Sequence, residues 1–258
     1  MNKAEGCTTA VILAGGEGQR VGRVGALLPK GLLPVSQEGT LISHLIDQLR
    51  TCKPERIVIS TSPENHSIYS SFLKKYVRLN EEECCSIQLL RNDKHQHGPI
   101  AALGAVVERY QSDRYVIALS DVHLTPNPFN KLAPQTRNSL IVSKHKPNSG
   151  GVVLCRGKKV VRLCYHPLHM DDKAEYLICS WSGSLLISHE ALPYLLDCAK
   201  CSRSCDPLEN WINAAISAEI DFNWIMIENF INVNKWEDFR RCINRPTRNP
   251  AQSLNRKP

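Results

Sequence analysis

Short runs of β-branched and other apolar residues alternate with longer amphipathic segments along the first half of the chain. The short runs predict strands, because such side chains pack well on a pleated, buried surface, and the longer segments show the apolar spacing of helices. Strands are expected at Thr9–Leu13, Arg56–Thr61, Ser86–Arg91 and Tyr115–Leu119, and helices at Thr40–Thr51, Glu64–Tyr76 and Pro99–Tyr110. This alternation is typical of βαβ units and predicts an α/β fold.

The pattern changes after Asp121, where the apolar runs become shorter. Strands are expected at Leu140–Ser143, Gly151–Cys155, Val160–Leu163, Tyr176–Ser180 and Leu185–Ile187, and helices near Glu190–Ala199 and Pro207–Ala218. We interpret residues 1–243 as one Rossmann-like domain whose mixed, mostly parallel sheet is flanked by helices. Because ligands of open α/β sheets bind beyond the carboxyl ends of the strands, the loops after Leu13, Arg91 and Leu119 are expected to share one crevice.

The composition fits one globular domain and adds a basic tail. A chain of 258 residues with 42% hydrophobic residues can bury a sizeable core. Part of the net charge of +7 comes from residues 244–258, where basic residues lie among Asn, Pro and Ser, which predicts disorder. No export signal or membrane-length apolar run is visible, so a cytoplasmic protein without a membrane partner is expected. Few aromatic residues lie near the basic ones, so no nucleic-acid partner is expected, and a homo-oligomer is left open.

The eleven cysteines are expected to be reduced thiols, because their number is odd and no export signal is visible. Cys198, Cys201 and Cys205 have a spacing that would suit three ligands of a zinc or iron–sulfur site. No spaced fourth ligand is evident, although Cys179 or Cys242 could approach in the fold. We therefore favour structural or exposed thiols over a metal site.

A glycine-rich turn follows the first predicted strand. Its sequence is Leu13-Ala14-Gly15-Gly16-Glu17-Gly18-Gln19-Arg20, and Pro29-Lys30-Gly31-Leu32-Leu33-Pro34-Val35 comes after it. Glycines let several backbone N–H groups approach one phosphate, and Arg20 and Lys30 can supply the charge that a triphosphate needs. The turn is neither a Walker loop nor a dinucleotide-binding turn. The alternative is a tight strand exit with a surface lysine.

The strand, Gly-Gly-x-Gly-x-Arg and Pro-Lys-x-Leu-Leu-Pro-Val resemble, in this order, the signature of the sugar-1-phosphate nucleotidylyltransferase family. Ten positions separate Arg20 from Lys30, as in the sugar-phosphate enzymes, whereas the related molybdenum-cofactor guanylyltransferases have a much shorter insert. The resemblance implies transfer of an NMP unit from a Mg-NTP to a small phosphorylated acceptor, with release of pyrophosphate. It implies a nucleotide-binding half at about 8–122 and an acceptor-binding half at about 123–243.

The resemblance also assigns roles to the residues of the turn and of the lysine motif. Leu13, Ala14 and the backbone from Gly15 and Gly16 to Gly18 would bind the nucleotide. The two catalytic residues would be Arg20, which holds the triphosphate, and Lys30, which bridges the reacting phosphates.

Asp121 directly follows an apolar strand, where a carboxylate can reach the crevice from a rigid support. Mg²⁺ prefers a few oxygen ligands plus substrate phosphates, although a strand-end Asp can also be a cap or turn former. The resemblance points to Asp121 as a Mg²⁺ ligand. It points to Asn234 as the second, because Asn232-Val233-Asn234-Lys235-Trp236-Glu237-Asp238 looks like the family's Asn-Val-Asn-x-Pro-Glu-Asp segment, with Trp236 in place of the proline. The alternative for Asn234 is a cap of the helix that begins near Trp236.

The segment Asn92 to Leu103 matches the family's nucleobase-contacting loop. Gly98 matches a glycine that lies against the base, and Asp93 occupies the position of a Gln five residues earlier. A carboxylate only accepts hydrogen bonds, so it suits guanine N1–H and N2–H. This favours GTP, with CTP next. His95 and His97 are expected to be loop residues rather than metal ligands.

The acceptor half departs from the family pattern. Tyr165-His166-Pro167 stands where sugar-phosphate enzymes carry Glu-Lys-Pro, and Trp181-Ser182-Gly183 stands where they carry Asn-Ala-Gly. His166, when protonated, together with Ser182 and Gly183, is the candidate acceptor site. The departures argue against a common hexose-1-phosphate acceptor. Two other interpretations remain, a molybdenum-cofactor-type guanylyltransferase and a non-catalytic subunit that binds nucleotide sugars.

Overall fold

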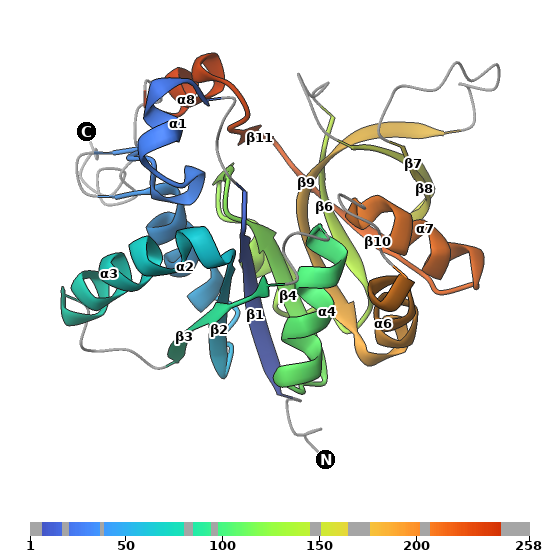
Figure 1. Cartoon of the computed structure of the whole chain (residues 1–258). Coiled ribbons are helices and arrows are strands. Elements are labelled where there is room, and N and C mark those ends of the chain that lie inside the picture. The colour runs from blue at the N-terminus through green and yellow to red at the C-terminus, as the bar shows by residue number, and fades with distance from the viewer. Residues whose placement is uncertain are drawn as a thin grey trace, which may run out of the picture.

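One nine-stranded sheet runs through the part of the chain that the computed structural model describes, which is residues 7–16, 21–36, 39–79, 85–93, 98–144, 151–164, 176–201 and 207–243 (Figure 1). The strand order is β3-β2-β1-β4-β9-β6-β10-β8-β7. In chain order the strands are β1 (Thr8–Ala14), β2 (Arg56–Thr61), β3 (Ser86–Arg91), β4 (Arg114–Leu119), β6 (Ser139–Ser143), β7 (Val152–Arg156), β8 (Lys159–Cys164), β9 (Leu177–Ser188) and β10 (Asn223–Ile227).

The sheet is mixed but mostly parallel in direction, as predicted. β3, β2, β1 and β4 pair in parallel. β9 is antiparallel to β4, β6 and β7, and β8 is antiparallel to β10 and β7, while β6 and β10 are parallel. Only β8 and β9 therefore run against the other strands of this sheet. The carboxyl ends of β1, β2, β3 and β4 meet at one edge, which is where the sequence predicted the crevice.

Helices cover both faces of the sheet (Figure 1). One face packs against α4 (Pro99–Arg109), α6 (Leu192–Cys201) and α7 (Leu208–Ser217), and the other against α2 (Leu41–Arg50), α3 (Pro63–Leu79) and α5 (Phe129–Leu132). β1 serves both cores, because Val11 and Leu13 point to the first while Ala10 and Ile12 point to the second. This alternation explains why β1, an interior strand between β2 and β4, is apolar on both sides.

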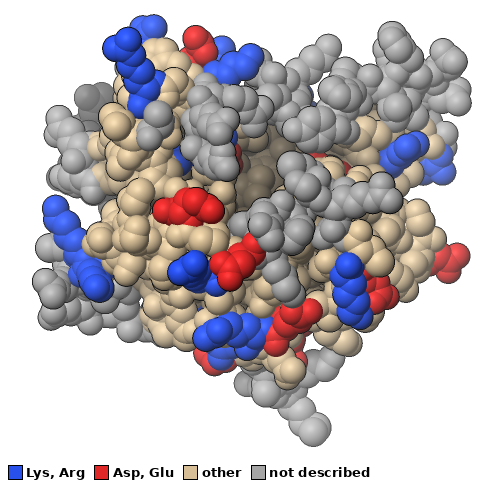
Figure 2. Space-filling view, viewed as in Figure 1, with Lys and Arg blue, Asp and Glu red and all other residues tan. Residues whose placement is uncertain are grey.

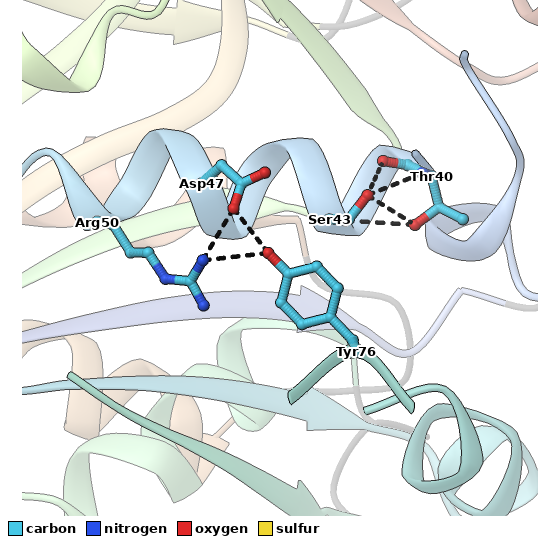
Figure 3. A network of polar contacts seen from close by, with 5 residues as sticks. All are labelled: Thr40, Ser43, Asp47, Arg50 and Tyr76. Carbon is cyan, nitrogen blue, oxygen red and sulfur yellow. Dashed lines mark hydrogen bonds and ion pairs between the residues drawn. The ribbon is translucent and has the colours of Figure 1, made fainter. Parts of the chain in front are cut away.

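Helix α2 is capped and tied to α3 by a polar network (Figure 3). Thr40 and Ser43 form a capping box, in which the Ser43 N–H donates to Thr40 Oγ1 at 3.3 Å and the Thr40 N–H donates to Ser43 Oγ at 2.8 Å. The Tyr76 hydroxyl of α3 donates to Asp47 Oδ1 at 2.6 Å, and Arg50 donates to the same oxygen at 2.9 Å. Burial and the Asp47 carboxylate raise the pKa of Tyr76. The network fixes the two helices that flank the amino-terminal half.

Two of the observed differences from the predicted elements have a clear physical cause. Tyr176–Ser180 and Leu185–Ile187 were expected as separate strands but form one strand, β9, that continues through Gly183 at φ 78°. β5 (Val122–Thr125) and β11 (Asn229–Asn232) form an additional two-stranded sheet that the pattern did not predict. Four residues are too few to show a strand period, so their pairing is decided by the tertiary structure.

The predictions on the tail, the cysteines, metal sites and membrane helices can be compared with the structure only within the described residues. The predicted tail at 244–258, together with Cys84 and Cys205, lies outside the described residues. The nine cysteines within them form no disulfide with one another. The described ranges contain no group of three or more His, Cys, Asp or Glu residues that could hold a metal ion. They also contain no helix that is long and apolar enough to cross a membrane.

Candidate active site

The ammonium of Lys30 lies between two side chains from distant parts of the chain. Lys30 Nζ donates to Asp121 Oδ2 at 2.8 Å and to Asn234 Oδ1 at 3.0 Å. The side chains of Lys30 and Asp121 are only 9% and 20% exposed, so their ion pair is partly shielded from water. The structure therefore brings together three of the residues that the sequence singled out, and the Lys30 ammonium bridges the side-chain oxygens of the other two.

A short 3₁₀ turn, η2 (Lys30–Leu32), sets the backbone position of Lys30. It approaches the core closely at Gly31, where a Cβ atom would lie 2.6 Å from Tyr69 Oη and 3.1 Å from Ser120 Cβ. Tyr69 is buried, its hydroxyl hydrogen-bonds with Ser120, and burial raises its pKa. Glycine at position 31 thus lets the turn rest on the residue before Asp121, which fixes the distance between Lys30 and Asp121.

The small β5/β11 sheet brings Asn234 to Asp121. The Val233 N–H donates to the Asp121 carbonyl at 2.8 Å, directly after the last β5/β11 pair. Asp238 in the first turn of α8 (Trp236–Ile243) accepts from the Asn234 and Lys235 N–H groups at 3.2 and 3.0 Å. The carboxylate of Asp238 therefore caps this helix, and the side-chain oxygen of Asn234 is directed at Lys30.

The glycine-rich turn leaves β1 at the same edge of the sheet. The Ser120 N–H donates to the Leu13 carbonyl at 3.1 Å, so the carboxyl ends of β1 and β4 lie side by side. Leu13 and Ala14 are buried at the end of β1, whereas Gly16 is exposed and has open space around it. Gly15 lies between them and is half-buried. Gly18 and Arg20 lie outside the described residues.

The molecule is hollowed over this edge. Figure 2, viewed as Figure 1, shows the hollow over the carboxyl ends of the central strands. On the face shown, Lys and Arg side chains are interspersed with Asp and Glu over the described surface. The hollow therefore lies at the edge where the parallel strands end.

The predicted base-contacting residues Asp93 and Gly98 lie after β3 and before α4. Asn92 is buried and donates to Ser60 Oγ at 3.2 Å and to the Ala102 carbonyl at 2.9 Å, which ties the end of β3 to β2 and α4. Asp93 is exposed, with its Oδ1 3.6 Å from Arg91 Nε. Gly98 has φ 92° and precedes Pro99, the first residue of α4. The role of Asp93 and Gly98 stays a prediction, and His95 and His97 lie outside the described residues.

The predicted acceptor residues lie in the middle of β9. Ser182 is buried, donates to the Ile141 carbonyl at 3.0 Å and accepts from the Ser184 N–H at 3.2 Å. Gly183 lies against Leu119, since a Cβ atom there would be 2.5 Å from Leu119 Cδ1. Gly183 therefore borders the end of β4, two positions before Asp121, whereas Ser182 is bonded to β6 and within β9. His166 lies outside the described residues.

Comparison with known families identifies the domain. The sequence model of the MobA-like NTP transferase domain matches residues 10–183, more than half of the chain. The chain belongs to this family. It is a nucleotidyltransferase, as the glycine-rich turn and the Pro-Lys motif predicted.

Individual relatives agree with this assignment. A stretch of 56 residues is 43% identical to a Rhodopirellula baltica protein assigned as a molybdenum cofactor guanylyltransferase, and it spans 22% of this chain and 24% of that protein. The fold is similar to that of a Bacillus anthracis protein assigned as a glucose-1-phosphate thymidylyltransferase, with a TM-score of 0.76, 19% identity and 98% of each chain covered. It is also similar to that of the CTP:phosphocholine cytidylyltransferase from Streptococcus pneumoniae, with a TM-score of 0.69, 17% identity, and 92% of this chain and 98% of that chain covered. At these identities the two structures show the fold.

The oxygen atoms at the centre of this nucleotidyltransferase suit a divalent cation. A carboxylate oxygen of Asp121 and the amide oxygen of Asn234 already converge on one positive charge, the ammonium of Lys30. Mg²⁺ is usually held by one or two carboxylates together with substrate phosphates and water. The two side chains fit such a site, in which nucleotide phosphates complete the coordination.

Glu209 is a buried carboxylate in the acceptor half that the sequence analysis missed. It lies in the first turn of α7 and is 9% exposed. A Cβ atom on Gly151 would lie 2.8 Å from Glu209 Oε1 and 3.5 Å from Trp181 Cε3, so the carboxyl group and the indole ring both pack against Gly151. Burial raises its pKa. In the sequence it reads as an ordinary acidic residue at a helix start, which gives no signal of burial.

Replacing Glu209 with glutamine is expected to raise the melting temperature, and by more at high pH. Because burial raises the pKa of Glu209 in the folded protein, the unfolded chain loses this proton first. The wild type therefore loses stability as the pH rises above the unfolded value of about 4.3. Glutamine cannot ionise, so the variant escapes this loss. Thermal melts at about pH 4.5 and about pH 8 measure the effect. An equal gain at both values, or an equal gain in the exposed-site control Glu190→Gln, would contradict it.

Proposed function

We propose that this nucleotidyltransferase transfers an NMP unit, GMP in preference and CMP next, from a Mg-NTP to a phosphorylated small acceptor of the sugar-phosphate type. The observation that carries the proposal is the convergence of Lys30, Asp121 and Asn234 beside the exit of β1. A phosphate-binding turn, a buried ammonium and two cation-binding oxygens at one sheet edge are the parts that phosphoryl chemistry requires. We place this activity in the cytoplasm.

In the proposed reaction an oxygen of the acceptor phosphate attacks the α-phosphorus of the nucleotide in line. A new P–O bond forms, the bond between the α-phosphorus and the bridging oxygen breaks, and pyrophosphate leaves. Lys30 neutralises charge on the reacting phosphates, and Arg20 is proposed to hold the triphosphate. Asp121 and Asn234 would hold Mg²⁺, which would supply further charge neutralisation. A phosphate oxygen is already nucleophilic, so the protein needs no general base.

The identity of the acceptor is the least constrained part of the proposal. By their names, the two structurally similar proteins act on glucose 1-phosphate and phosphocholine. Trp181-Ser182-Gly183 replaces the Asn-Ala-Gly of sugar-phosphate enzymes, and the Ser182 hydroxyl is bonded to backbone atoms of β6 and β9. We therefore expect Ser182 and Gly183 to shape the acceptor subsite mainly through backbone position.

A molybdenum-cofactor-type guanylyltransferase is the second candidate, and the 56-residue match to the Rhodopirellula baltica protein favours it. The ten positions between Arg20 and Lys30 favour the sugar-phosphate group instead. GTP is the proposed nucleotide for both candidates, so the acceptor distinguishes them. A non-catalytic regulatory protein would bind nucleotide but release no pyrophosphate.

The proposal is tested by pyrophosphate release from each of the four common NTPs with Mg²⁺. The acceptors are sugar 1-phosphates, phosphocholine and molybdopterin. We expect release with GTP and one acceptor class, because the Asp93 carboxylate accepts from both guanine donors. Asp93→Gln is expected to lower the preference for GTP over UTP by about tenfold or more. Preference for UTP in the wild type would refute the base assignment, and nucleotide binding without release would support the regulatory alternative.

A further inference from the structure

The Lys30 ammonium occupies the point at which a divalent cation would bind. It is nearly buried, and the oxygens that accept from it are the same two that the proposed function assigns to Mg²⁺. An ammonium ion and a divalent cation cannot share these oxygens closely, because two positive charges a few ångströms apart in a shielded site repel strongly. In the nucleotide-free protein the centre is already neutral, since one lysine balances one aspartate.

We propose that Lys30 is a built-in substitute for the metal, which closes the cation site until a nucleoside triphosphate draws the ammonium onto its phosphates. The inference rests on the proposed function for the identity of the two ligands. It adds an order of events. Free divalent cations bind poorly to the empty enzyme, and the cation enters together with the triphosphate.

The geometry allows this exchange because the backbones that carry the two oxygens are held, while the lysine side chain is long and flexible. The Asp121 carbonyl accepts from the Val233 N–H, and the Asn234 N–H donates to Asp238. The turn that carries Lys30 packs at Gly31 against Tyr69 and Ser120. The four-carbon side chain of Lys30 can therefore move its ammonium while the backbones of Asp121 and Asn234 stay in place.

The exchange also has a thermodynamic consequence. When the ammonium leaves, Asp121 and Asn234 keep their positions but lose their cation, so the site becomes negative and attracts a metal ion. Nucleotide and metal therefore favour each other's binding, and by linkage the factor is the same in both directions. Removing the ammonium by mutation is expected to have the same effect on metal binding as drawing it away.

The test is Mn²⁺ binding to the nucleotide-free protein, measured by electron paramagnetic resonance of free Mn²⁺. Lys30→Met removes the charge but keeps the apolar stem, and it is expected to bind Mn²⁺ about tenfold more tightly than the wild type. Lys30→Arg keeps a positive charge and is expected to bind as weakly as the wild type. Lys159→Met is the matched control, because Lys159 forms an exposed ion pair with Asp221 at 2.8 Å. It should bind like the wild type.

Equal or weaker Mn²⁺ binding by Lys30→Met would overturn the inference, and so would tightening in Lys30→Arg. Lys30→Gln serves as a second neutral variant if Lys30→Met does not fold, as judged by circular dichroism. The measurement needs neither acceptor nor turnover. Tightening in Lys30→Met without pyrophosphate release in any assay would leave the inference standing and the proposed function failed. Pyrophosphate release by the wild type without tighter Mn²⁺ binding by Lys30→Met would support the proposed function and overturn the inference.

Discussion

Replacing Asp121 with asparagine is expected to lower pyrophosphate release by about 10³-fold. The substitution removes the carboxylate charge that the proposed metal site depends on, at a position where the side chain is 20% exposed and partly shielded from water. The amide oxygen of asparagine can still accept from Lys30, so the fold is expected to persist. Initial rates under saturating nucleotide, with circular dichroism of the same samples, measure both effects.

The matched control for Asp121 is Asp221→Asn. Asp221 also pairs with a lysine, Lys159, at 2.8 Å, but both side chains are more than half exposed. Exposed ion pairs contribute little, so this variant is expected to keep the wild-type rate. Full activity in Asp121→Asn, or an equal loss in Asp221→Asn, would contradict the assignment of Asp121.

Replacing Gly183 with alanine is expected to destabilise the fold by about 3 kcal/mol. Gly183 has φ 78°, which is costly for any residue with a Cβ atom, and that atom would lie 2.5 Å from Leu119 Cδ1. Because Leu119 leads to Asp121, the displaced side chain should also lower activity. Thermal and denaturant unfolding measure the stability, and pyrophosphate release measures the activity.

Gly157→Ala separates the two causes. Gly157 also has a positive φ, 59°, but a Cβ atom there would meet nothing within 4 Å, so only the backbone cost of about 1–2 kcal/mol applies. In the double variant Gly183→Ala/Leu119→Ala the contact is relieved, and the loss should be smaller than the sum of the single losses. Equal losses in Gly183→Ala and Gly157→Ala would show that contact with Leu119 is unimportant.

The amino-terminal half was predictable because its local signals agree with the fold. The bounds of β2 and β3 are the predicted ones, and Thr40 and Thr51, the predicted ends of a helix, are the caps of α2. In this half the strands are largely apolar, and consecutive strands are connected through amphipathic helices. Local pattern and global structure therefore specify the same elements.

The centre of the site was predicted in its members but not in its contacts. The residues point to Lys30 as a phosphate-binding charge and to Asp121 as a ligand, and the resemblance adds Asn234. No periodicity shows that one ammonium bridges both oxygens, because Lys30 and Asn234 are 204 positions apart. The β5/β11 pairing that brings Asn234 to Asp121 is too short to show a strand pattern in the sequence.

Other contributors were missed because their burial is a tertiary property. Tyr69 looks like one more apolar position of an amphipathic helix, yet its hydroxyl lies beneath Gly31 and beside Ser120. Asp238 looks like a surface residue of the last helix, yet it is buried and holds the Asn234 backbone. Such roles depend on which elements meet in space, and a single sequence does not give that.

The β5/β11 pairing also determines when the Lys30 centre can be completed. β1, β2, β3 and β4 all precede residue 120, so a growing chain carries them well before it carries β11. β11 ends at Asn232, and the oxygen of Asn234 reaches Lys30 only after this strand joins β5. A growing chain therefore lacks the contact between Lys30 and Asn234 until β11 has been made, long after the four parallel strands.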